Sequence, residues 1–78
     1  MDISYFIERI EDEFEDIKPG LLTPGSDYKK ILEWSSVNAL IMISLIDAEF
    51  EVILNANDLN KTNTISELYK LIEKKKIS

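Results

Sequence analysis

The chain has 78 residues, of which 45% are apolar, and its formal net charge is −6. A chain of this size is expected to form one small domain, residues 1–78, with little stability to spare. It contains no cysteine and no histidine, which excludes a disulfide framework and any thiolate or imidazole metal site, and we expect no metal. Because phosphate binding requires clustered basic residues, the acidic balance argues against nucleic acid and favours basic protein partners.

The first predicted element is an amphipathic helix that starts behind Asp2. Apolar residues recur at steps of three and four from Ile3 to Ile17, which is the spacing of one helix face. The other face is acidic, and we interpret it as a solvated surface. Pro19 and Gly20 end this helix in the prediction. The acidic N-terminus lacks the positive region of a signal peptide, so we expect a cytoplasmic protein.

A long connection follows from Pro19 to Trp34 and contains both prolines and both glycines of the chain. Such a loop is uncommon in a compact domain unless it is packed against the core or functional. Its apolar side chains are suited to fastening it to a core, with Trp34 as a core residue. A short helical turn is expected around Tyr28–Leu32.

The second long helix is predicted to begin at the paired serines, Ser35 and Ser36, and to continue to about Glu51. The segment is apolar on nearly every face and is too long for a usual strand. Its most apolar part, Val37–Ile46, falls well short of the about 20 residues that a membrane-spanning helix needs, so we expect no stable membrane insertion. A helix of this kind is either central in its domain or presents an apolar patch to a partner.

Two further helices are indicated by their capping residues. A short helix or turn is expected over Asn55–Lys61, with Asn55 or Asn57 as its cap. Thr64-Ile65-Ser66-Glu67 is a capping box that begins the last helix, and Lys74–Lys76 crowd its end. The predicted fold is therefore all-α: a small four-helix bundle of three longer helices and one short one, with a long loop between helices 1 and 2.

The paired serines have two interpretations, as the cap of a helix or as a site of covalent modification. Serine is a favoured N-cap residue. A catalytic serine needs an activating base, and the chain has neither histidine nor a G-x-S-x-G motif. Carboxylate pairs such as Glu11 with Glu15 lie on outer helix faces, away from any cleft that would separate their pKa values. We therefore expect no enzyme activity, and a serine used chemically would be modified by another enzyme.

The stretch Trp34-Ser35-Ser36-Val37 resembles the W-D-S-L motif that opens the second helix in one branch of the acyl carrier protein family. Ser35 stands in place of the aspartate and Val37 in place of the leucine. Phe50 follows Ser36 by fourteen residues and closes Asp47-Ala48-Glu49-Phe50, which looks like the acidic end of that helix. Thr64-Ile65 resembles the start of the family's fourth helix. The order of elements resembles the family over essentially the whole chain.

This resemblance implies that Ser36 carries 4′-phosphopantetheine through a phosphodiester, with Ser35 as the less favoured position. A phosphopantetheinyl transferase would add the group, and the thiol of the arm would carry acyl groups as thioesters. The implied partners are acyl-loading and condensing enzymes of fatty acid biosynthesis, polyketide-type or other lipid metabolism. We expect a monomer.

The predicted partner-binding residues lie on the second helix: Val37, Leu40, Ile41, Asp47, Glu49 and Glu51. Typical family members carry more acid on this helix, where Asn38, Ala39 and Ile41 stand here. We therefore expect specialised, more hydrophobic partners. The alternative is a carrier-like helical module without modification, which binds a protein or lipid partner through the same apolar helix.

Overall fold

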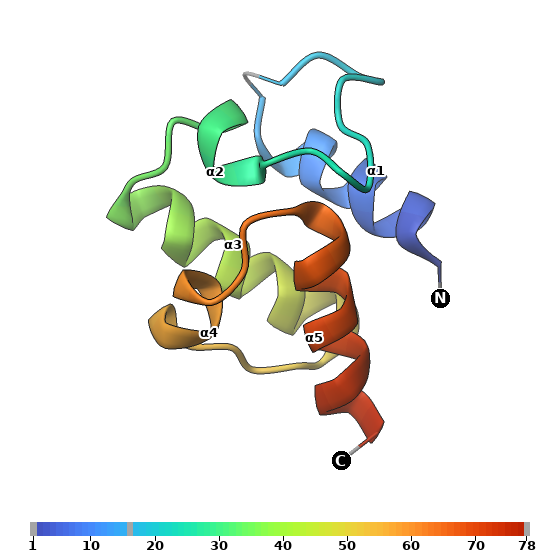
Figure 1. Cartoon of the computed structure of the whole chain (residues 1–78), viewed down its shortest axis with the longest axis vertical. Coiled ribbons are helices and arrows are strands. Elements are labelled where there is room, and N and C mark those ends of the chain that lie inside the picture. The colour runs from blue at the N-terminus through green and yellow to red at the C-terminus, as the bar shows by residue number, and fades with distance from the viewer. Residues whose placement is uncertain (1, 16, 78) are drawn as a thin grey trace.

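The computed structural model describes residues 2–15 and 17–77, and its secondary structure is helical (Figure 1). The five helices are α1 (Ile3–Glu13), α2 (Tyr28–Ile31), α3 (Ser36–Phe50), α4 (Ala56–Asn60) and α5 (Ile65–Ile77). The described residues form no strand, so the all-α prediction is confirmed. Three helices are long, as predicted, but two are short instead of one, because the turn expected near Tyr28 is a separate helix.

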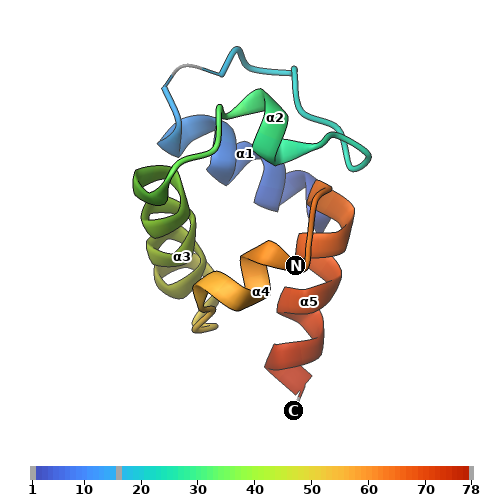
Figure 2. The ribbon, with the colours of Figure 1, turned by 60° about the vertical axis from the view of Figure 1, so that its left-hand side comes forward.

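The three long helices meet around Phe6, whose side chain is fully buried. Its ring packs edge-on against Phe50 of α3 at 5.5 Å between centroids, and lies 6.0 Å from Tyr69 of α5. Aromatic pairs of this geometry contribute about 0.5–1.5 kcal/mol beyond the apolar area they bury. Figure 2 shows how the helices are arranged: α3 and α5 lie on either side, with α4 between them, and α1 and the long connection lie at one end.

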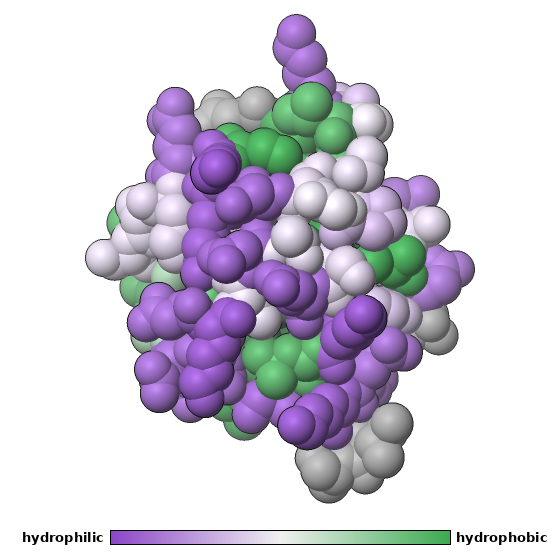
Figure 3. All heavy atoms as spheres, in the orientation of Figure 1, coloured by the Kyte–Doolittle hydropathy of each residue, from purple (hydrophilic) through white to green (hydrophobic). Residues whose placement is uncertain are grey.

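One apolar cluster draws on every helix and on the connections between them. Its buried members are Phe6, Ile10, Phe14, Ile17, Leu22, Tyr28, Leu32, Met42, Leu45, Ile46, Phe50, Val52, Leu54, Leu59, Ile65, Leu68 and Ile72. Outside this core, the face seen in Figure 3 is mostly hydrophilic, with small and separate apolar patches. Some large apolar side chains are nevertheless exposed, among them Val37 and Leu40 of α3 at 64% and 65% and Ile53, just after α3, at 78%.

Helix α1 ends at Glu13, so the prediction that it continues to Pro19 and Gly20 is wrong. Phe14 has an extended backbone, with φ −100° and ψ 93°, although its amide still bonds to the Ile10 carbonyl oxygen. Phe14 and Ile17 are nevertheless buried. The apolar spacing beyond Glu13 therefore reflects an irregular segment packed on the core, because helix spacing and core packing select the same residue types.

Acidic residues crowd the end of α1. Glu11, Asp12 and Glu13 place negative charge in its last turn, where the helix dipole is also negative. The Glu11 carboxylate instead accepts hydrogen bonds from the backbone amides of Gly20 at 2.9 Å and Leu22 at 3.4 Å. Gly20 has φ +87°, in the left-handed region that favours glycine. The chain thus turns back on α1 after the helix has ended.

The long connection is fastened along the segment that enters α5. Backbone amides donate from Ser66 to the Pro24 carbonyl at 2.8 Å and from Ile65 to the Ser26 carbonyl at 3.1 Å. In the opposite direction, the Tyr28 amide donates to the Asn63 carbonyl at 3.1 Å. These bonds satisfy backbone groups that would otherwise lose water as the connection packs. They also fix where α2 begins.

Tyr28 anchors the connection from within the core. Its side chain is fully buried, and its hydroxyl lies 2.7 Å from Oγ1 of Thr62, the buried polar residue of the described chain. The hydroxyl also approaches the carbonyl oxygens of Thr62 at 3.2 Å and Leu59 at 3.4 Å. Burial raises the pKa of Tyr28, while the bond to Thr62 acts in the opposite sense. The neutral phenol therefore joins α2 to the end of α4.

The predicted helix caps are confirmed. Asp2 caps α1, and Asn55, the first of its two candidates, caps α4. Before α5, Thr64 Oγ1 accepts from the Glu67 amide at 3.1 Å. The Glu67 carboxylate accepts from the amides of Asn63 at 2.8 Å and Thr64 at 3.1 Å. Each cap satisfies amide groups that have no partner inside their helix.

The bond between Tyr28 and Thr62 is expected to stabilise the fold measurably. Tyr28→Phe and Thr62→Val should each lower the free energy of unfolding, and the two effects should be coupled by about 1 kcal/mol. Urea unfolding of the wild type, both single variants and the double variant measures that coupling energy. Additive effects of the two substitutions would contradict an anchoring bond.

The capping box should make stability depend on pH. The two amides that donate to Glu67 lower the pKa of its carboxyl below the ordinary value of 4.5. The hydrogen bonds to the ionised Glu67 carboxylate stabilise the fold fully at pH values above this ordinary pKa. Their contribution is lost as the pH falls through the lowered pKa, because the protonated carboxyl is a weaker acceptor. Glu67→Gln should therefore destabilise the protein at neutral pH, and the difference in midpoint temperature from the wild type should shrink in acid. A difference that is constant with pH would contradict this role.

Candidate functional site

A tight turn delivers the paired serines to the start of α3. Glu33 has φ +51°, in the left-handed region that residues with side chains rarely adopt. The Trp34 amide donates to the Lys29 carbonyl at 3.1 Å. The Trp34 ring then packs against the buried ring of Tyr28, with 5.2 Å between centroids and an interplanar angle of 75°. Trp34 is half-buried at the edge of the core, and it links this turn to the Tyr28 anchor.

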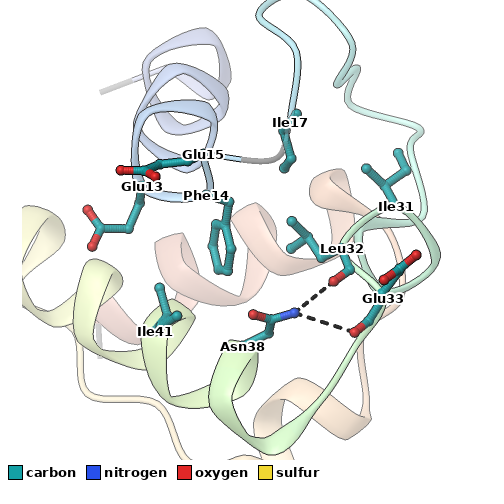
Figure 4. A pocket seen from close by; sticks show the side chains of 9 residues that line it. All are labelled: Glu13, Phe14, Glu15, Ile17, Ile31, Leu32, Glu33, Asn38 and Ile41. Carbon is teal, nitrogen blue, oxygen red and sulfur yellow. Dashed lines mark hydrogen bonds between the residues drawn. The ribbon is translucent and has the colours of Figure 1, made fainter.

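Asn38 holds the turn from the other side. Its side-chain amide donates to the Leu32 carbonyl at 2.7 Å and lies 3.4 Å from the Glu33 carbonyl (Figure 4). These carbonyls precede the helix, so the side chain closes the turn back onto the first turn of α3. Asn38 thereby supports the strained backbone at Glu33 and sets the direction in which the next two residues leave.

The two serines have different roles in this geometry. Ser35 is the N-cap of α3, because its Oγ accepts a hydrogen bond from the Asn38 amide at 3.2 Å. Ser36 is the first residue of the helix and is exposed, and its hydroxyl has no partner among the described residues. The first two helical amides, of Ser36 and Val37, also have no acceptor within the helix. Ser36 thus presents a free hydroxyl beside donors that favour a negatively charged group.

An apolar pocket of about 490 Å³ opens beside Ser36, between α3 and α4. We call it the serine pocket, and its lining residues are Trp34, Ser35, Ser36, Ala39, Leu40, Ile43, Ala56 and Asn60. Its volume lies within the range of about 300–1,000 Å³ that is typical of small-molecule sites. A group attached to the Ser36 hydroxyl would therefore have an apolar surface within reach.

Three of the six predicted partner-binding residues share the exposed face of α3 with Ser36. Leu40 and Asp47 follow Ser36 by four and eleven residues, which is the spacing of one helix face. Val37 is 64% exposed and Leu40 is 65% exposed, and Asp47 is exposed as well. Val37 and Leu40 therefore lie next to Ser36, while Asp47 shares this face about three helix turns further along α3.

The other three predicted residues lie elsewhere on α3 or at its end. Glu49 faces α1, where its carboxylate accepts from the Tyr5 hydroxyl at 2.9 Å and from Arg9 at 3.3 Å. Ile41 is half-buried and faces away from the serine pocket. Glu51 is exposed just after the helix, with φ +56°. Glu49 is thus part of the contact between α1 and α3.

Three residues that shape this site were not predicted from the sequence: Asn38, Ala56 and Asn60. Asn38 follows the N-cap Ser35 by three residues. A polar side chain at this position of an apolar helix is the sequence signal that could have indicated its role. Ala56 and Asn60 line the serine pocket from α4. They come from a part of the chain distant from the serines, and no local pattern connects them.

Comparisons with known protein families and with curated proteins give no match for this chain. Among the described residues, no helix combines the length and apolar character needed to cross a membrane. Within the same residues, acidic side chains form no group of three or more suited to holding a metal ion.

Replacing Asn38 by aspartate tests its role with almost no change in shape. Asn38→Asp should lower the free energy of unfolding by about 1–3 kcal/mol, because a carboxylate would face two carbonyl oxygens without a proton to donate. Chemical denaturation measures the loss. Asn57→Asp is a matched control on an exposed position of α4 and should have little effect. Equal effects of the two substitutions would contradict the assigned role of Asn38.

Proposed function

We propose that this protein is an acyl carrier protein, which holds acyl intermediates as thioesters on a 4′-phosphopantetheine arm attached to Ser36. The observation that carries the proposal is the exposed, unpartnered Ser36 hydroxyl at the first position of α3, next to an apolar pocket. In this proposal the fold is the four-helix carrier bundle. Helices α1, α3 and α5 are its longer helices, α4 is the short one, and α2 lies inside the long loop.

The surroundings of Ser36 suit a phosphodiester. The Ser36 oxygen would attack the pantetheine-bearing phosphorus of coenzyme A, the pyrophosphate bond would break, and adenosine 3′,5′-bisphosphate would leave. The serine proton would pass to a base of the transferase, and this chain need only present the hydroxyl. The free amides of Ser36 and Val37 and the helix dipole then favour the attached negative charge. The arm supplies a terminal thiol for thioester chemistry. The serine pocket offers an apolar surface to part of the attached acyl chain.

Ser35 replaces the aspartate of the family motif without loss of the cap. Its Oγ makes the bond to the Asn38 amide that an aspartate side chain would make. What changes is the charge beside Ser36, since a neutral hydroxyl stands where the family has a carboxylate. A transferase that reads that carboxylate would load this carrier slowly.

The proposed partners are the transferase and the enzymes that load and condense acyl groups. The face next to Ser36 offers Val37 and Leu40 as exposed apolar contacts, with Asp47 as its charge. We therefore expect partners whose docking surface is more hydrophobic than that of partners suited to an acidic carrier helix. The same exposed side chains support the second candidate, a carrier-like module without modification that binds a partner through α3.

Incubation with phosphopantetheinyl transferases and coenzyme A tests the proposal directly. Intact mass spectrometry should show one phosphopantetheinyl group on the wild type and none on Ser36→Ala. Ser35→Asp keeps the cap and restores the motif, so it should be loaded faster than the wild type.

The other outcomes distinguish the alternatives. An adduct that persists in Ser36→Ala would refute the assignment of the residue while keeping the function. Absence of an adduct with several transferases, including one from the same organism, would favour the unmodified binding module. Circular dichroism of each variant controls for loss of the fold.

A further inference from the structure

The serine pocket is lined by three polar groups that have no hydrogen-bond partner among the described residues: the Ser36 hydroxyl, the Trp34 indole N–H and the Asn60 carboxamide. The fourth polar residue of the lining, Ser35, already accepts a bond from the Asn38 amide. An indole N–H only donates a hydrogen bond, whereas a carboxamide both donates and accepts. Small-molecule sites typically combine an apolar wall with a few such polar groups, which fix the orientation of the ligand.

The apolar wall of this pocket is open to a ligand. None of the lining residues belongs to the buried core, and Leu40 is 65% exposed. Ala39 and Ile43 are half-buried and flank Leu40 along α3. A ligand can therefore contact these side chains without opening the core. No charged side chain lines the pocket, so its chemistry suits a neutral group that contains both apolar carbon and an amide.

The length of the pocket matches the near half of a pantetheine arm. Along α3, Ser36 and Ile43 are separated by about 10 Å of helix axis. The extended arm, with its two amides, is about as long as five residues of extended chain, which is about 17 Å. Its geminal methyl groups and its first amide lie within about 7 Å of the phosphorus, the length of about two residues. The near half of the arm therefore carries both kinds of group that the pocket suits.

We propose that the serine pocket binds the near half of the arm itself. In this inference, which rests on the proposed attachment at Ser36, the Trp34 indole N–H donates to the carbonyl of the first amide. The Asn60 carboxamide accepts from the N–H of the same amide, and the geminal methyl groups pack on Ala39 and Ile43. The outer half of the arm, with its thiol, then extends beyond the pocket and stays accessible to partner enzymes.

Covalent attachment favours this occupant over a free ligand. An attached arm meets the pocket as an intramolecular partner, at an effective concentration in the millimolar range. A free fatty acid fits less well, because its carboxylate finds no basic side chain in the lining. An acyl chain on the thiol reaches the same apolar wall only by folding back along the arm, so the arm has first access.

Chemical attachment of an arm tests the pocket without any transferase. The chain contains no cysteine, so Ser36→Cys provides a single thiol. Alkylation of that thiol with the 4′-iodoacetyl ester of S-methyl pantetheine forms a thioether and releases iodide and a proton. The linkage is slightly longer than the phosphodiester. The same variant treated with iodoacetamide carries a short cap instead of the arm and serves as the reference.

Nuclear magnetic resonance of the two isotope-labelled adducts should show the arm in the pocket. Relative to the reference, the arm should shift the side-chain amide of Asn60 and the indole N–H of Trp34, the single tryptophan of the sequence. Nuclear Overhauser contacts should connect the geminal methyl groups with Trp34 and Ile43. The side-chain amide of Asn57, which is exposed on α4 and outside the pocket lining, should not shift.

Two matched substitutions in α4 measure the contribution of Asn60. In the arm-bearing variant, Asn60→Ala should lower the ratio of pocket-bound to free arm by about two- to tenfold, because one hydrogen bond is lost. Asn57→Ala should leave this ratio unchanged. The chemical shifts of the geminal methyl groups, compared with those of free S-methyl pantetheine, report the ratio, and the backbone amide spectra show whether each variant is folded.

Several results would overturn the inference. Shifts confined to residues next to the attachment point would place the arm in solvent. Equal effects of the two alanine substitutions would exclude a specific contact with Asn60, and shifts that grow with protein concentration would identify a second copy of the chain as the occupant. These outcomes do not depend on whether a transferase loads the wild type, which tests the proposed function alone.

Discussion

The buried hydroxyl of Tyr28 is the contact on which the arrangement around Ser36 depends. It bonds to Thr62 at 2.7 Å inside the core, and the backbone on either side of it is paired with the segment entering α5. The Trp34 ring packs on Tyr28. Trp34 lies between the turn at Glu33 and the start of α3, so this contact positions both. A chain of this size has few other ways to hold a long connection in one conformation. The position of the serines is thus set by a contact made in the core.

Helix α3 separates two pockets. On one side the free Ser36 hydroxyl stands beside the serine pocket. On the other side a second pocket, called the acidic pocket because Glu13, Glu15 and Glu33 line it, opens between α1 and the long connection. Asn38 belongs to both, because its backbone amide is capped by Ser35 while its side chain closes the turn at the edge of the acidic pocket.

Much of the local structure could be predicted from the sequence, because capping depends on residues close together in the chain. Asp2, Ser35, Asn55 and the box formed by Thr64 and Glu67 cap helices where their side chains indicate. The end of α1 was mispredicted because apolar side chains at helix spacing also suit a packed irregular segment.

The long-range part of the site could not be predicted in the same way. The bond between Tyr28 and Thr62 joins residues far apart in sequence, and neither residue type signals the other. The serine pocket needs Ala56 and Asn60 from α4, and the acidic pocket needs Glu13 and Glu33 on opposite rims. These arrangements follow from packing of the whole domain, which residue spacing does not encode. The proposal of attachment at Ser36 rests on the motif resemblance, and the structure contributes the free hydroxyl.

The most direct test of this account is peptide mass spectrometry of the protein isolated from the cells that make it. The account predicts that the peptide containing both serines carries a phosphopantetheinyl group, and that fragment ions place it on Ser36. A peptide that is unmodified throughout, or that carries the group on Ser35, would contradict the central claim.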